Sequence, residues 1–164
     1  MIHTTPPEEI AAEKAAKLRY DLIPVASWPR MAYATEARNV AASVGWGRRE
    51  ALRTLICMIR GTIRGHADYA DADDDAAATV MAYGRAKHGR STYRVAGSEQ
   101  SRPETHWASC VRHLVEHHRD PKAVESGSGY PVLWHALAQA LITLDLLVCP
   151  VEGPDGEHDG RGML

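Results

Sequence analysis

Hydrophobic residues recur at intervals of three and four along most of the chain, the spacing that places side chains on one face of an α-helix. The clearest case is the segment 48–64, which we expect Gly65 to end. Strict alternation of hydrophobic and polar residues with hairpin turns is scarce, so the pattern predicts an all-α fold, a helical bundle of about five helices. The expected buried face of 48–64 consists of Leu52, Leu55, Ile56, Ile59 and Ile63.

Capping residues, glycines and prolines mark the ends of the predicted helices. Thr5-Pro6-Pro7-Glu8 and Ser101-Arg102-Pro103-Glu104 have the form of capping boxes and predict helices that begin there. Gly45-Trp46-Gly47 is expected to separate two helices, and Pro150 to stop the last one. The remaining expected elements are helices over 27–43 and 75–88, an extended connector at 17–24, an acidic loop at 66–75, a polar loop at 90–102 and a disordered tail at 150–164.

Composition narrows the class of protein. The chain has 164 residues and a net charge of -2, so we expect one domain over 1–149 without the basic field that holds nucleic acid. Three widely spaced cysteines favour a reducing cytoplasm over a disulfide framework. Neither an apolar run long enough for a membrane span nor the pattern of a signal peptide is present, so a soluble intracellular protein is expected.

The segment 101–148 holds most of the candidate chemistry, including five of the nine histidines. On the expected helix, His106, Cys110, His113 and His117 form a continuous stripe, a spacing that can bind zinc. The alternative is a polar flank whose imidazoles are hydrogen-bonded to their neighbours. The stripe borders an expected apolar face made of Trp107, Val111, Leu114, Val115 and His118.

Polar residues within the last helix allow two interpretations each. Asp145 lies in an otherwise apolar stretch. It is either a magnesium ligand or, on the other interpretation, the partner of an arginine or histidine or exposed near the helix end. His135 and Gln139, four residues apart, either face a ligand together or serve the core. On the preceding helix, Arg112 is suited to phosphate or to an ion pair with Glu116.

Several familiar motifs are absent. The acidic run from Asp68 to Asp75 lacks the glycine and distal glutamate of a calcium-binding EF-hand loop, and a solvated loop with helix N-terminal charge is the better account. The sequence has no Walker A motif, no GxSxG and no dinucleotide fingerprint.

Four pieces of the chain, in order, resemble a phage-encoded family, the N-terminal domain of dATP/dGTP diphosphohydrolases, which is related to MazG-like nucleotide pyrophosphatases. The pieces are KLRYDLIP (17–24), YGRAKHG (83–89) with Tyr93 after it, RHL (112–114), and ESG (125–127) followed by Pro131, Leu133, His135 and Ala136.

The chain also departs from the family pattern. Residues 25–75 stand where the family has a short connection, which predicts a helical insertion. Ser128 and Gly129 are additional, and Val132 stands where the family commonly has a histidine. The ExxE pair and later ExxD pair with which MazG-type enzymes hold magnesium are missing from the predicted helices.

The resemblance implies hydrolysis of purine deoxynucleoside triphosphates to monophosphate and pyrophosphate, with a divalent metal, magnesium rather than zinc. It implies a homo-oligomer and a phage protein in the cytoplasm of a bacterial host. The alternatives are a non-catalytic nucleotide-binding or assembly protein that retains the fold, and a zinc-stabilised helical module. The roles that follow are catalysis by His113 or His135, substrate binding by Tyr83, Lys87, His88, Tyr93 and Arg112, and metal binding by Glu116, Glu125 and Asp145.

Overall fold

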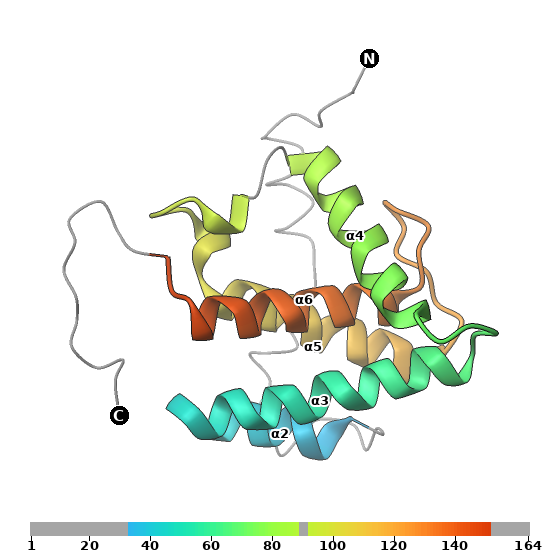
Figure 1. Cartoon of the computed structure of the whole chain (residues 1–164), viewed down its shortest axis with the longest axis horizontal. Coiled ribbons are helices and arrows are strands. Elements are labelled where there is room, and N and C mark those ends of the chain that lie inside the picture. The colour runs from blue at the N-terminus through green and yellow to red at the C-terminus, as the bar shows by residue number, and fades with distance from the viewer. Residues whose placement is uncertain (1–32, 89–91, 152–164) are drawn as a thin grey trace.

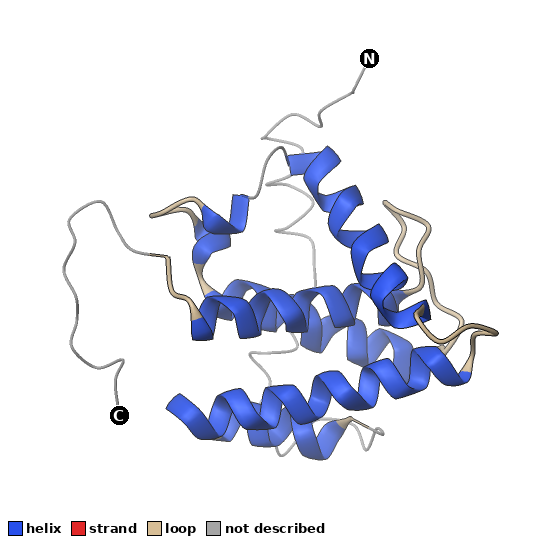
Figure 2. Ribbon diagram, in the orientation of Figure 1, coloured by secondary structure: helices blue, strands red, loops and turns tan. Residues whose placement is uncertain are grey.

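The computed structural model describes residues 33–88 and 92–151, and the part of the chain that it describes is helical without strands. The predicted all-α class is therefore confirmed (Figure 2). A single antiparallel bridge joins Val124 to Pro131 in the loop before the last helix. The elements are α2 (Ala34–Ala42), α3 (Gly45–Gly65), α4 (Ala72–His88), η3 (Thr92–Arg94), η4 (Glu99–Ser101), α5 (Pro103–Arg119) and α6 (Val132–Val148).

The centre of the bundle is the pair α5 and α6, which pack against each other along their lengths (Figure 1). They run antiparallel, because His113 lies beside His135 near one end and His106 beside Gln139 further along. Helix α3 lies along α6 and packs against α2, which lies behind it in Figure 1, whereas α4 crosses α6 at a steep angle. The short helices η3 and η4 lie near the C-terminal end of α6, opposite the loop that joins α5 to α6.

The core forms where the hydrophobic periodicity predicts it. All five residues expected on the inner face of α3 are buried, and they pack with α5 and α6 in one cluster. Trp107, Val111, Leu114 and Val115 are buried as expected, but His118 is exposed and does not belong to that face. Because α3 contributes a full side of the core, the described part of the expected insertion 25–75 is integral to the bundle.

Two predicted boundaries and one predicted cap are wrong. The break after α2 falls at Ser43 and Val44, both of which are extended, and Gly45-Trp46-Gly47 forms the first turn of α3 instead. Helix α4 begins at Ala72, so the last aspartates of the acidic run lie inside its first turn. The side chain of Ser101 does not cap α5, since it donates to the carbonyl of Ser98 and Arg102 occupies the N-cap position.

Some predictions fall on parts of the chain about which the structure gives no description. They are the capping box at Thr5, the helix that follows it, the connector 17–24, the start of the helix 27–43 and most of the tail 150–164.

A buried ion pair joins α3 to α4. Asp73 is 0% exposed, and its carboxylate accepts two hydrogen bonds from Arg64, at 2.6 Å from Nε and 3.1 Å from Nη2. Arg60 Nε lies 3.5 Å from the same carboxylate. A buried carboxylate is tolerated only with such partners. The solvated role expected for the acidic run therefore does not hold for this residue.

We expect this ion pair to make the free energy of unfolding depend on pH in the acid range. The hydrogen bonds from Arg64 hold the pKa of Asp73 below its ordinary value, despite the opposing effect of burial. A lowered pKa in the folded state stabilises the protein above about pH 4 and ceases to do so as pH falls through the folded pKa. In urea titrations, Asp73→Asn should therefore be less stable than the unaltered protein at pH 7, and the difference should shrink toward pH 3.

Asp75→Asn, at an exposed position of the same helical turn, provides the matched control. A difference between the Asp73→Asn variant and the unaltered protein that stays constant from pH 7 to pH 3 would contradict the assignment.

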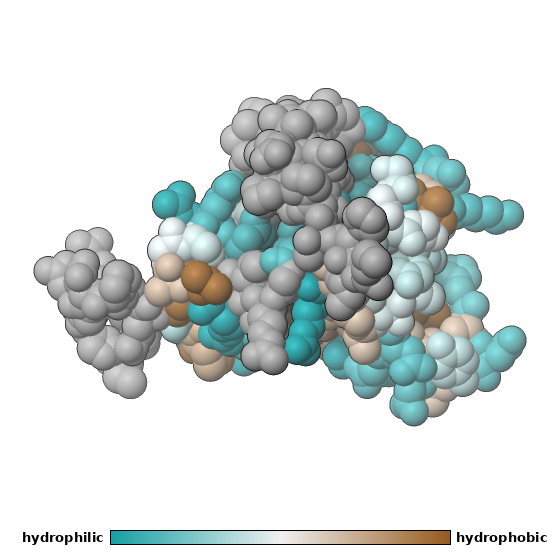
Figure 3. All heavy atoms as spheres, turned by 90° about the horizontal axis from the view of Figure 1, so that it is seen from above, coloured by the Kyte–Doolittle hydropathy of each residue, from teal (hydrophilic) through white to brown (hydrophobic). Residues whose placement is uncertain are grey.

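In the described residues no helix is both long and apolar enough to cross a membrane. On the face shown in Figure 3, hydrophilic side chains dominate the described surface, with hydrophobic ones scattered among them. The most exposed large hydrophobic side chains are Val44 and Trp46, at the start of α3.

Candidate functional site

A pocket of about 470 Å³ lies between α4, α5 and α6 and is extended by η3 and η4. It brings together residues that are more than fifty positions apart in the sequence. Most of the side chains predicted to form a site line it: Tyr83, Lys87, His88, Tyr93, Arg112, Glu125, His113 and His135.

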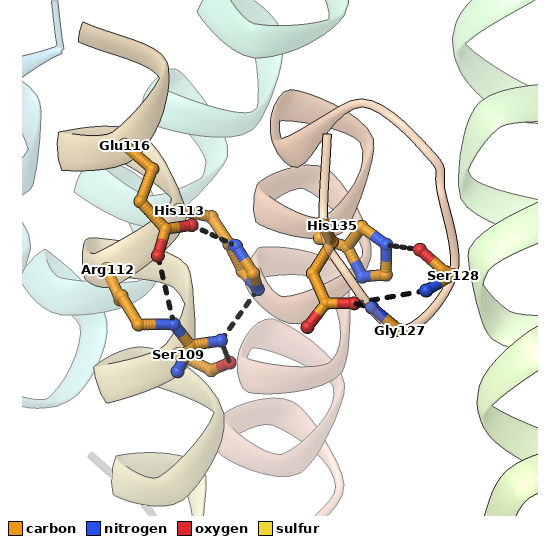
Figure 4. Close-up of polar contacts among 8 residues, drawn as sticks. Ser109, Arg112, His113, Glu116, Gly127, Ser128 and His135 are labelled. Atoms are coloured by element: carbon orange, nitrogen blue, oxygen red, sulfur yellow. Dashed lines mark hydrogen bonds and ion pairs between the residues drawn. The ribbon is translucent and has the colours of Figure 1, made fainter. Parts of the chain in front are cut away.

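His113 projects from α5 and is hydrogen-bonded through both of its ring nitrogens. Its Nδ1 lies 3.0 Å from Glu116 Oε2, and its Nε2 lies 2.9 Å from Arg112 Nη2. Since an arginine can only donate, Nε2 accepts this hydrogen bond and Nδ1–H donates to the carboxylate. Burial lowers the pKa of His113, and the positive charge of Arg112 acts in the same direction against the effect of Glu116. The side chain is therefore a neutral, oriented imidazole (Figure 4).

Glu116 does not line the pocket but supports His113 from behind. Burial would raise the pKa of this carboxyl, but the hydrogen bond from His113 and the charge of Arg112 lower it on balance. Glu116 Oε1 also lies 3.6 Å from Arg112 Nε. A carboxylate held in this way fixes the tautomer of the histidine, the arrangement that prepares an imidazole to accept a proton at its other nitrogen.

Arg112 bridges the histidine and the open pocket. Its Nη2 donates to Ser109 Oγ at 3.2 Å as well as to His113. The guanidinium lines the pocket, and an anionic ligand could replace Ser109 and His113 as its hydrogen-bond partners. The sequence left open whether Arg112 binds phosphate or pairs with Glu116, and the structure shows the ion pair together with a place in the pocket wall.

A tight loop between α5 and α6 places the second histidine. Glu125 Oε2 accepts hydrogen bonds from the backbone amides of Gly127 and Ser128, at 2.9 and 3.2 Å. Ser128 Oγ lies 2.7 Å from His135 Nε2, and the His135 ring lies 5.2 Å from that of His113 (Figure 4). Ser128, which is additional to the family pattern, thus orients a pocket histidine.

Helix α4 closes against this loop at Gly127. A Cβ atom there would lie 3.1 Å from the hydroxyl of Tyr83, 3.2 Å from Glu125 Oε2 and 3.9 Å from Lys87 Nζ. Glycine lets the loop approach the helix closely enough to bring the hydroxyl and the ammonium group to the pocket rim.

Asp145 lies outside the pocket. Its carboxylate forms an ion pair with Arg94, which also donates to the carbonyl of Cys149 at 2.7 Å. Of the two interpretations left open by the sequence, the structure shows the partner to an arginine near the helix end. Asp145 is not brought near Glu116 or Glu125, so the three acids predicted as metal ligands do not converge.

The described residues contain no group of three or more His, Cys, Asp or Glu side chains that could hold a metal ion. Burial raises the pKa of the Cys110 thiol to about 12, so without a metal the group is a neutral thiol near neutral pH. The ring nitrogens of His106 and His113 are already hydrogen-bonded. These two residues fit the hydrogen-bonded flank, whereas the buried Nδ1 of His117 has no hydrogen-bond partner among the described residues.

At the far end of the pocket, Tyr93, His106 and Gln139 were candidates from the sequence, but Gln100 was not. There His106 Nε2 donates to the backbone carbonyl of Gln100 at 2.8 Å, and Nδ1 lies 2.7 Å from Gln139 Oε1. The ring of Tyr93 meets that of His106 edge to face, with centroids 6.2 Å apart. Gln100 lies in a polar loop without periodicity, so no sequence signal identified it.

Known proteins do not identify the site. No family model, curated protein or solved structure matches this chain.

Proposed function

We propose that this protein binds a purine deoxynucleoside triphosphate in the pocket and hydrolyses it to the monophosphate and pyrophosphate. The observation that carries the proposal is the convergence of the residues in the family-like pieces 83–93, 112–114 and 125–136 on one pocket. These pieces were matched by sequence order alone, and a chance likeness gives no reason for their side chains to meet. The pocket also combines cations for phosphate with aromatic rings for a base.

The residues of the pocket suit hydrolysis at a phosphate. Arg112 and Lys87 bind the phosphate oxygens, and Arg112 exchanges its hydrogen bond to His113 for one to phosphate. The freed Nε2 of His113 then takes the proton of the attacking water. The water oxygen bonds to the α-phosphorus, the bond to the oxygen that bridges the α- and β-phosphates breaks, and pyrophosphate leaves with that electron pair.

The described acids do not fit a resident metal site, so no step is assigned to a protein-bound metal. Magnesium commonly binds to proteins through substrate phosphates and only one or two carboxylates. We therefore expect magnesium to arrive on the triphosphate, as part of the substrate, with Glu125 the one predicted ligand that lines the pocket.

The second candidate is a nucleotide-binding protein without catalysis. It is favoured by the engagement of Glu116 and Asp145 in ion pairs, which leaves the acids of a MazG-type metal site unassembled. On this alternative the ligand and the pocket are the same, and only turnover is missing.

The test is to measure pyrophosphate release and, separately, equilibrium binding of dATP, dGTP, dCTP and dTTP, with magnesium and with EDTA. Release from the purine nucleotides that EDTA abolishes is the result expected of the enzyme. Binding without release would favour the second candidate, and absence of both would overturn the assignment of a nucleotide. Arg112→Ala should weaken binding, whereas Arg119→Ala, exposed on the same helix, is the matched control.

The resemblance extends this proposal to assembly and location. We propose a homo-oligomer in the cytoplasm of a phage-infected bacterium, and sedimentation at several concentrations would establish the number of subunits.

A further inference from the structure

The two ends of the pocket differ chemically. One end holds Arg112, Lys87 and the pair His113 and His135, which are cations and imidazoles. The other end holds Tyr93, His106 and the carboxamides of Gln100 and Gln139. Seven residues of α5 separate His106 from His113, which corresponds to about 10 Å along the helix axis. A ligand that reaches both ends meets cations at one end and carboxamides beside an aromatic ring at the other, which suits a nucleotide.

Gln100 carries a hydrogen-bond donor that the described protein leaves unused. Its side-chain Nε2 is shielded from solvent and has no hydrogen-bond partner among the described residues. A shielded N–H group without an acceptor is costly, and each such group in a native structure calls for an explanation. Gln100 lines the pocket, so a ligand acceptor there would satisfy its amide.

His106 holds the backbone of Gln100, from which this donor projects. Through one ring nitrogen it holds the backbone carbonyl of Gln100, and through the other it contacts the side chain of Gln139 on α6. It also supports the ring of Tyr93 from the edge. His106 is therefore a positioning residue that ties η4 to α6 and keeps both carboxamides at the same end of the pocket.

We infer that this end of the pocket reads the nucleobase and that the side-chain N–H of Gln100 donates to the 6-oxo group of a purine. Guanine and hypoxanthine present an acceptor oxygen at C6, with the N7 acceptor beside it. Adenine presents an amino group at C6, which would oppose one donor with another. The inference rests on the proposed binding of a nucleotide and adds Gln100 as its specificity-determining residue.

The experiment is calorimetric binding of dGTP, dITP, dATP and inorganic triphosphate, with the unaltered protein and with Gln100→Leu and Gln100→Glu. For the unaltered protein we expect dGTP and dITP to bind about tenfold more tightly than dATP, the size of effect that one hydrogen bond supplies. Because dITP lacks the 2-amino group of dGTP, it isolates the contribution of the 6-oxo group. Gln100→Leu should abolish the preference and leave the affinity for inorganic triphosphate unchanged.

The Gln100→Glu variant keeps the shape of the side chain and replaces its donor by an acceptor. Its negative charge should weaken all the ligands, so the ratio of affinities is the quantity to compare, and that ratio should move toward dATP. Glu99→Ala, at the exposed neighbouring position, is the control for folding and for the loop.

The outcomes separate this inference from the proposed function. An unchanged ratio of dGTP to dATP affinity in both Gln100 variants would overturn the role of Gln100 while nucleotide binding stands. Failure of every nucleotide to bind the unaltered protein would overturn the proposed function and this inference with it.

Discussion

Replacing His113 by glutamine is expected to slow pyrophosphate release from dGTP by about two to four orders of magnitude, the usual contribution of a general base. Glutamine is similar in length and can still hydrogen-bond to Glu116, but it cannot take a proton from water. Nucleotide affinity should change little, because Arg112 and Lys87 supply the contacts to phosphate. The measurements are the single-turnover rate and the dissociation constant of dGTP.

The pH profile gives a second readout of the same role. Since burial lowers the pKa of His113, the base is neutral over a wider range than an exposed histidine. The rate should therefore be maintained on lowering the pH through 6.5, the ordinary pKa of histidine, and should fall only at more acid values. His118→Gln, exposed one turn further along α5, serves as the control. A rate left intact in the His113→Gln variant would assign the proton transfer elsewhere, with His135 the next side chain to test.

Leu137→Ala should destabilise the fold by about 2–5 kcal/mol, the range for a leucine removed from a tightly packed core. Leu137 is 0% exposed, and α6 is the helix against which α3, α4 and α5 all pack. A cavity there cannot be filled by the movement of a single neighbour. Urea unfolding should show a lower midpoint with an unchanged slope.

Val148→Ala is the matched control on the same helix, because Val148 is 44% exposed. Its effect should stay within about 0.5 kcal/mol, as for other surface positions. Equal destabilisation by the two substitutions would mean that the described core does not dominate the stability of the protein.

Local patterns predicted much of the fold. Helical periodicity was sufficient for α3, since its buried face follows from residue spacing within one helix. The boundary before α3 was wrong because glycine was taken as a breaker, whereas the extended backbone of Ser43 and Val44 makes the break. The capping role of Ser101 failed for a related reason, since its hydroxyl has a nearer acceptor in Ser98.

The candidate site, too, was predicted from the sequence only in part. His135 and Gln139 face the pocket together, as their spacing on one helix allowed. The partner of Asp145 could not be identified, because Arg94 lies 51 residues away in the sequence and meets Asp145 only in the folded protein. Gln100 was missed because its side-chain amide becomes buried without a hydrogen-bond partner only in the folded protein, and the local sequence does not indicate this.

The ion pair between Arg94 and Asp145 also affects the entropy of binding. Arg94 follows Tyr93 directly and is attached to the last turn of α6 by its contacts to Asp145 and to the carbonyl of Cys149. The segment between Arg94 and the start of α5 is thereby held at both ends and has fewer conformations to lose. A ligand that binds against Tyr93 would therefore lose less of its interaction energy to the ordering of this segment.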